Sequence, residues 1–149
     1  MKDIYNHLRL TDRLSCSGMP KPEQLRDVAE AGVQFVVNLA TPKSENWNPQ
    51  EGETLQHLGV EYLSIPVDWE KPTRQNLDDF MNVMDAHKDK SALVHCQANY
   101  RATAFVALYR ILRLGWEPDD AFVDLRKIWN PEEYPVWQTF IEQCLKGMS

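Results

Sequence analysis

The chain has 149 residues, of which 43% are hydrophobic, with five tryptophans and a formal net charge of −6. This length and composition exclude a disordered chain and predict one domain, residues 1–149, with its own hydrophobic core. The acidic balance argues against a broad surface for nucleic acid or for an anionic membrane, although it is compatible with a local basic pocket.

The first half of the chain predicts one helix and two strands. Residues 20–31 have the pattern of a helix, with Gly32 as its end. Residues 33–39 are short, apolar and rich in β-branched side chains, as expected for a buried strand, and residues 60–67 form the next strand. Residues 41–52 between them hold two prolines and several polar side chains, so we expect a loop that overhangs a site.

The second half begins with a helix that Thr73 caps. Its apolar side chains have the spacing of one buried stripe: Leu77, Phe80, Met81 and Met84. Residues 92–95 then form a short strand, and Arg101 opens a helix to residue 114 that is apolar nearly all round. This last helix is expected to be central and buried, with Arg110 and Arg113 as its solvent-exposed edge.

Residues 118–128 predict a further helix, and Asn130 is a good start for the last one. Pro135 lies too far inside that last helix, which predicts a kink or a late start. Strands that alternate with helices imply an α/β fold, a mixed sheet with helices on both faces. Ligands in such sheets lie beyond the carboxyl ends of the strands, which is where Cys96 follows strand 92–95.

The segment from His95 to Arg101 carries the chemistry: His95-Cys96-Gln-Ala-Asn-Tyr-Arg101. A loop that enters a helix N-terminus presents unpaired backbone N–H groups, which bind anions and favour the deprotonated form of a cysteine. Arg101 adds a planar charged group that can grip two phosphate oxygens. The segment therefore predicts a thiolate at the base of an anion-binding cradle.

This segment resembles the His-Cys, five residues, Arg motif of the cysteine-dependent protein tyrosine and dual-specificity phosphatases. Upstream segments are similar in order and spacing to the small bacterial dual-specificity-like phosphatase domains, so that the resemblance runs from about Leu14 to Leu114. These segments are Leu14-Ser-Cys-Ser-Gly-Met-Pro20, Glu23-Gln-Leu25, Ala31-Gly-Val-Gln-Phe-Val-Val-Asn-Leu39 and Tyr62-Leu-Ser-Ile-Pro-Val-Asp68.

The resemblance implies a phosphatase-like mixed sheet with the Cys loop between a central strand and a buried helix. It also implies a nucleophile at Cys96, a phosphate clamp at Arg101 and a general acid at Asp68, with Glu70 in reserve. His95 would support the thiolate. The phosphate is expected to contact Gln97, Ala98, Asn99, Tyr100, Arg101 and Ala102.

The chain departs from the family in ways that bear on turnover. Only four residues separate Cys96 from Arg101, and none of them is glycine. Asn99 can partly replace glycine because Asn visits left-handed conformations more readily than most residues. Ala102 stands where the family has a hydroxyl, and Thr103 lies one place further on. These departures keep open a phosphate-binding pseudophosphatase as an alternative function.

Loop length also keeps open a rhodanese-like sulfurtransferase, since that family commonly spaces Cys and Arg by four residues. No analogue of its upstream Gly-His-Ile-Pro-Gly-Ala segment occurs. The flanking chain resembles the phosphatases instead.

Three widely spaced cysteines without a Cys-x-x-Cys pair indicate a reducing compartment, and no apolar run reaches the length of a membrane span. We therefore expect a cytoplasmic protein without cofactor or metal. Its partner is expected to be a phosphorylated protein or a small phosphorylated metabolite, with no nucleic acid and no membrane. The sequence leaves the oligomeric state open.

Overall fold

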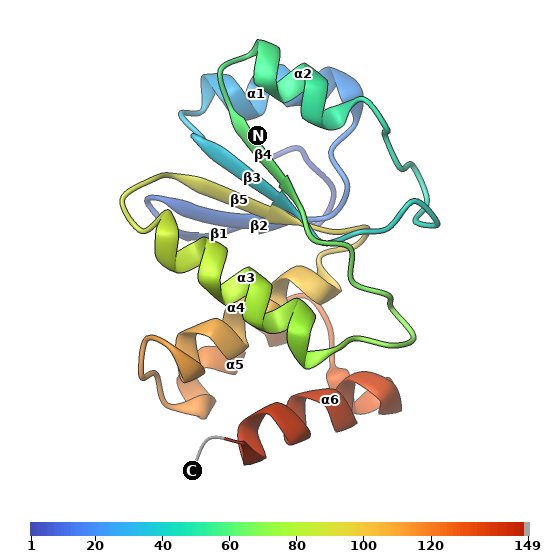
Figure 1. Ribbon diagram of the computed structural model, residues 1–149, viewed down its shortest axis with the longest axis vertical. Helices are drawn as coiled ribbons and strands as arrows, with labels where there is room; N and C mark the ends of the chain where they lie inside the picture. The colour runs from blue at the N-terminus through green and yellow to red at the C-terminus, as the bar shows by residue number, and fades with distance from the viewer. Residues whose placement is uncertain (148–149) are drawn as a thin grey trace.

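The computed structural model describes residues 1–147 and has a five-stranded sheet at its centre (Figure 1). The strand order is β1-β2-β5-β3-β4, with β1 antiparallel to β2 and all other pairs parallel. The strands are β1 (Leu8–Thr11), β2 (Leu14–Ser17), β3 (Phe35–Asn38), β4 (Glu61–Ser64) and β5 (Ala92–His95).

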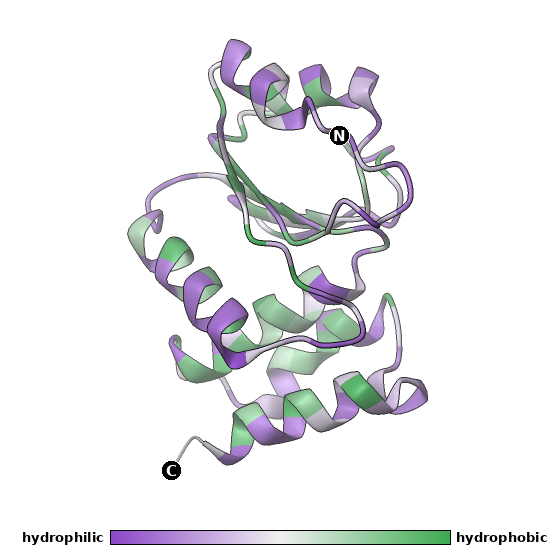
Figure 2. Ribbon diagram, turned by 45° about the vertical axis from the view of Figure 1, so that its right-hand side comes forward, coloured by the Kyte–Doolittle hydropathy of each residue, from purple (hydrophilic) through white to green (hydrophobic). Residues whose placement is uncertain are grey.

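Helices cover both faces of this sheet, as the sequence predicted. Two short helices lie on one face and four on the other (Figure 1). The first group is α1 (Leu25–Glu30) and α2 (Glu51–His57); the second is α3 (Arg74–Ala86), α4 (Tyr100–Leu112), α5 (Pro118–Arg126) and α6 (Pro135–Lys146). In Figure 2 the helices carry hydrophobic and hydrophilic residues on different sides, as expected for helices that cover a core.

The two faces of the sheet bury separate hydrophobic clusters. Adjacent residues of a strand point to opposite faces, so that Val36 of β3 packs against α1 and α2 whereas Val37 packs against the larger cluster. The parallel strands β3 and β5 are buried over their whole length, which explains their continuous apolar sequence.

Helix α4 is central and buried, as expected, but one of its arginines is not where the sequence placed it. Arg113 is exposed, whereas Arg110 is 3% exposed. Arg110 Nη1 donates a hydrogen bond to Asp124 Oδ2 of α5 at 2.8 Å, and its guanidinium lies 4.2 Å from the centroid of the Trp116 ring. The expectation of an exposed Arg110 was wrong because a carboxylate on the next helix satisfies its charge.

The helix start expected at Thr73 is confirmed, whereas Asn130 caps a 3₁₀ turn and not the last helix. Thr73 caps α3 by accepting a hydrogen bond from the Asn76 N–H. The last helix starts late, at Pro135, after a 3₁₀ turn at Pro131–Glu133. The predicted helix over residues 20–31 is a 3₁₀ turn at Pro22–Gln24 that continues into α1.

Three elements are absent from the sequence-based expectations. Strands β1 and β2 have four residues each, and Ser15 and Ser17 of β2 are buried although polar. Helix α2 begins at Glu51, inside the segment expected to be loop, and buries only Glu51 and Leu55. Neither β2 nor α2 carries enough apolar periodicity to be read from sequence.

Among residues 1–147, no helix combines the length and the apolar character that crossing a membrane requires.

Candidate active site

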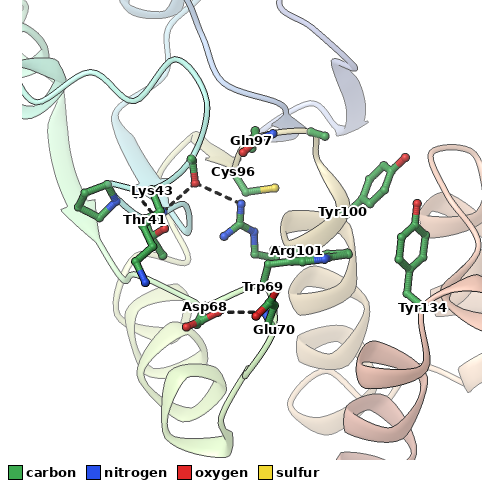
Figure 3. A pocket seen from close by; sticks show the side chains of 13 residues that line it. Thr41, Lys43, Asp68, Trp69, Glu70, Cys96, Gln97, Tyr100, Arg101 and Tyr134 are labelled. Atoms are coloured by element: carbon green, nitrogen blue, oxygen red, sulfur yellow. Dashed lines mark hydrogen bonds between the residues drawn. The ribbon is translucent and has the colours of Figure 1, made fainter.

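A pocket of about 700 Å³ lies beyond the carboxyl ends of the parallel strands (Figure 3). The loops after β3, β4 and β5 form it, together with the first turn of α4 and one tyrosine that precedes α6. Its lining residues are Thr41, Pro42, Lys43, Ser44, Asp68, Trp69, Glu70, Cys96, Gln97, Ala98, Tyr100, Arg101 and Tyr134.

Cys96 follows the last residue of β5 directly, and its backbone N–H donates to the Ser17 carbonyl of β2 at 3.3 Å. Its side chain is 1% exposed, yet it lines the pocket. Helix α4 begins four residues later, at Tyr100. The thiol therefore lies where a helix N-terminus and a loop favour an anion.

Arg101 lies in the first turn of α4 and is 5% exposed. Its Nη1 donates to the Val67 carbonyl at 2.7 Å, and its Nη2 lies 3.4 Å from Ser44 Oγ. In Figure 3 the Cys96 sulfur and this guanidinium face the same space. The loops after β3 and β4 thus hold the guanidinium beside the thiol.

The backbone of Asn99 is in the left-handed region, at φ 71°, where the loop turns into α4. Asn99 Nδ2 donates to the Asn6 carbonyl at 2.8 Å, and Asn6 Nδ2 donates to the Ala98 carbonyl at 3.0 Å. This reciprocal pair ties the N-terminal segment to the Cys loop. The role of Asn6 had no signal in the sequence, because it depends on a contact over more than 90 residues.

The structure separates the six residues expected to contact phosphate. Gln97, Ala98, Tyr100 and Arg101 line the pocket, whereas Asn99 and Ala102 are buried outside its lining. Gln97 Oε1 accepts a hydrogen bond from the Glu45 N–H at 3.0 Å, which links the Cys loop to the loop after β3.

The Thr103 hydroxyl is directed away from the thiol. Thr103 Oγ1 donates to the Asn99 carbonyl at 2.7 Å and accepts from Trp129 Nε1 at 2.9 Å. It therefore does not replace the hydroxyl that the family carries at the position of Ala102.

Asp68 and Glu70 both line the pocket and are both exposed. Asp68 Oδ1 accepts a hydrogen bond from the Glu70 N–H at 2.9 Å, which forms a local turn (Figure 3). The carbonyl of Val67, the residue before Asp68, accepts the hydrogen bond from Arg101, so the loop after β4 contributes both to the pocket lining and to the placement of the guanidinium.

His95 lies behind the loop, outside the pocket lining, and is fully buried. Its Nε2 is 2.6 Å from Glu51 Oε2, and its Nδ1 is 3.3 Å from the Cys96 carbonyl oxygen. Burial, and then the charge of Glu51, raise the pKa of the nearby Tyr62 above its usual value. Sequence reasoning missed Glu51 because α2 was not expected to exist.

An aromatic group forms the pocket wall near α6, and Tyr134 is the member that sequence reasoning missed. Tyr100 stacks on Trp129 with ring centroids 4.8 Å apart, and Tyr134 lies 5.8 Å from Tyr100. Burial, and then the neighbouring Tyr134, raise the pKa of Tyr100. Trp137 Nε1 donates to the Trp69 carbonyl at 2.8 Å, so α6 holds the loop that carries Asp68.

Within residues 1–147, no group of three or more His, Cys, Asp or Glu side chains is arranged to hold a metal ion.

A buried thiol and a guanidinium at the end of a central parallel strand, in this α/β architecture, define a cysteine-dependent phosphatase-like protein. A family model described as "DSP-PTPase phosphatase fused to NAD+ Kinase" matches residues 11–133, and the chain belongs to this family. The resemblance to cysteine-dependent phosphatases that the sequence predicted is thereby confirmed.

Solved structures show the same fold. A DUF442 protein of Shewanella putrefaciens CN-32, described as a candidate phosphatase, is 36% identical with a TM-score of 0.88, over 99% of this chain and 94% of that one. A variant of P. aeruginosa TpbA in complex with pTyr is 18% identical with a TM-score of 0.72, over 96% and 90% of the two chains. At that identity the likeness to TpbA concerns the fold alone.

A curated relative, a beta-lactamase hydrolase-like protein of Xylella fastidiosa (strain Temecula1), is 26% identical over 106 residues. The match covers 69% of this chain and 24% of the relative, so the chain spans about a quarter of its length.

Proposed function

We propose that residues 1–149 act as one phosphatase domain that hydrolyses phosphate monoesters through Cys96. The proposal rests on one observation. Cys96, Arg101 and Asp68 line the same pocket. These are the residue types that a nucleophile, an electrostatic clamp and a general acid require.

In this reaction the Cys96 thiolate attacks phosphorus. An S–P bond forms as the P–O bond to the leaving group breaks, and Asp68 gives its proton to the leaving oxygen. A water molecule then attacks phosphorus, passes a proton to Asp68 and displaces the thiolate, which releases inorganic phosphate. Arg101 and the backbone N–H groups of the Cys loop stabilise the charge on the three equatorial oxygens.

The balance of charge favours a substrate with one phosphate group. Arg101 and Lys43 are the cations among the lining residues, and Asp68 and Glu70 are the carboxylates. A volume of about 700 Å³ leaves room for a leaving group beside the aromatic wall. Phosphotyrosine, which the similar TpbA variant binds, and aryl-like small phosphates suit these features better than polyphosphorylated molecules.

The test is phosphate release from phenyl phosphate and 4-nitrophenyl phosphate. Cys96→Ser is expected to reduce both rates to that of buffer. Asp68→Asn is expected to lower the phenyl phosphate rate by about 10²–10⁴-fold and the 4-nitrophenyl phosphate rate by much less, because nitrophenolate leaves without a proton. Glu70→Gln is the matched control, since Glu70 lines the same pocket two residues away.

Equal phosphate release by wild type and Cys96→Ser would exclude the proposal. Phosphate binding that Arg101→Ala abolishes would in that case identify a pseudophosphatase, and thiocyanate formed from thiosulfate and cyanide would identify a sulfurtransferase. A selective loss in Glu70→Gln instead of Asp68→Asn would move the general acid to Glu70.

A further inference from the structure

Two ionisable side chains are buried together directly behind the Cys loop. Glu51 of α2 is 1% exposed and His95 of β5 is 0% exposed, with Oε2 and Nε2 2.6 Å apart. The other carboxylate oxygen, Glu51 Oε1, is buried without a hydrogen-bond partner among residues 1–147. A carboxylate is costly to bury, so its placement against a single partner requires an explanation.

The contacts determine where protons lie on His95. The Cys96 carbonyl can only accept a hydrogen bond, so Nδ1 at 3.3 Å must carry a hydrogen. The 2.6 Å contact between Nε2 and Oε2 requires one more hydrogen between those two atoms. The Glu51 carboxylate therefore anchors the imidazole at one nitrogen, and the Cys96 carbonyl anchors it at the other.

We infer that Glu51 is a positioning residue that fixes the ring of His95, so that the Nδ1–H of His95 holds the Cys96 carbonyl and with it the Cys loop. The inference deepens the proposed function and rests on it for its catalytic meaning. Glu51 itself does not line the pocket. It acts through His95 alone.

The other polar and charged groups near Glu51, His95 and Cys96 are the same in every variant of the test. Tyr62 of β4 faces Glu51, and the raised pKa of Tyr62 keeps it neutral near pH 7. Cys16 of β2 interacts with Cys96, and burial raises the pKa of Cys16 to about 12. Asn38 of β3 and Ser17 of β2 flank His95 in the sheet and carry no charge. The charged groups that face Cys96 across the pocket are Arg101, Lys43, Asp68 and Glu70.

The first experiment measures alkylation of Cys96 by iodoacetamide against pH, with peptide mass spectrometry as the readout. In Glu51→Gln the rate of Cys96 alkylation at pH 7 is expected to fall by about tenfold, because the carboxylate that anchors His95 is lost. Glu53→Gln is the matched control, because Glu53 lies on the same helix but is exposed, and its profile should equal that of wild type. An unchanged alkylation rate in folded Glu51→Gln would overturn the inference.

A second measurement uses the unmodified protein and so does not depend on how the variant folds. The ¹⁵N shifts of the His95 ring should show a hydrogen on Nδ1 at pH 7, and a ring whose Nδ1 carries no hydrogen would refute the inference. Neither measurement requires phosphatase activity. If the protein hydrolyses no ester but gives both results, the proposed function is wrong and the role of Glu51 still holds.

Discussion

Asn99 lets the Cys loop turn into α4 without a glycine. Its φ of 71° lies in the region that side chains with a Cβ usually avoid, and Asn tolerates it better than other residues. The hydrogen bond from its Nδ2 to the Asn6 carbonyl uses the side chain that glycine would lack. A loop one residue shorter than the family pattern can therefore turn without glycine.

Two substitutions at Asn99 separate the contribution of its side-chain hydrogen bond from that of its left-handed backbone. Asn99→Gly should lose the hydrogen bond alone, at about 0.5–1.5 kcal/mol. Asn99→Ala should lose the same bond and add strain of about 1–2 kcal/mol. Urea denaturation of the three proteins measures both values. Equal stability of the Gly and Ala variants would show that the left-handed backbone is not what selects Asn here.

At the scale of the elements, an ion pair joins α4 to α5 beside the apolar contact of Ala107, Ile111 and Ala121. Arg110 is 3% exposed, and the side chain of Asp124 is 23% exposed. Burial alone would raise the pKa of Asp124, but the hydrogen bonds from Lys127 and Arg110 outweigh it and hold that pKa below the usual value. The folded protein therefore favours the ionised carboxylate.

The pKa of Asp124 is lower in the folded protein than in the unfolded chain. The ion pair therefore stabilises the fold fully at pH values above the unfolded pKa, and this stabilisation is lost as the pH falls through the folded pKa. Asp124→Asn should lower the free energy of unfolding by about 1–3 kcal/mol at pH 7. Below about pH 4 the difference from wild type should shrink. Urea denaturation at a series of pH values measures this.

Lys127→Ala is the control for that series, since Lys127 is an exposed partner of the same carboxylate. It should cost no more than about 1 kcal/mol. A difference between wild type and Asp124→Asn that stays constant down to pH 3 would contradict the assignment of the pH dependence to Asp124.

At the scale of the whole molecule, the last helix supports the loop that carries Asp68. Trp137 of α6 is fully buried, and its Nε1 donates to the carbonyl of Trp69, the residue after Asp68. Its ring lies 5.3 Å from that of Trp69 and 6.1 Å from that of Phe105 in α4. Residues near the C-terminus thus help to shape the pocket.

Trp137→Phe keeps an aromatic ring in the core and removes the hydrogen bond to Trp69. We expect a loss of about 1–3 kcal/mol in stability and a lower kcat/KM for phenyl phosphate, because the Asp68 loop loses its support. The alkylation profile of Cys96 should stay as in wild type. Trp116→Phe, at a 39% exposed position, is the control. A shifted Cys96 profile in Trp137→Phe would show that the effect spreads beyond the Asp68 loop.

The sequence predicted the elements whose patterns are local. The apolar stripe of α3, the continuously apolar α4 and the buried strands before Asn38 and Cys96 all follow from spacing alone. β2 and α2 could not be predicted in this way, because they bury polar residues such as Ser17 and Glu51. The partner of Glu51, His95, lies 44 residues away in the chain.

By itself the sequence determined the α/β class, the phosphatase resemblance and the placement of Cys96 between a strand and a helix, since these depend on residues close in the chain. The tertiary structure decided which side chains share the pocket, which arginine is buried and which carboxylate pairs with His95. Glu51 and His95 are 44 residues apart in the chain and 2.6 Å apart in space. Such pairs arise from packing across the sheet, which local periodicity does not encode.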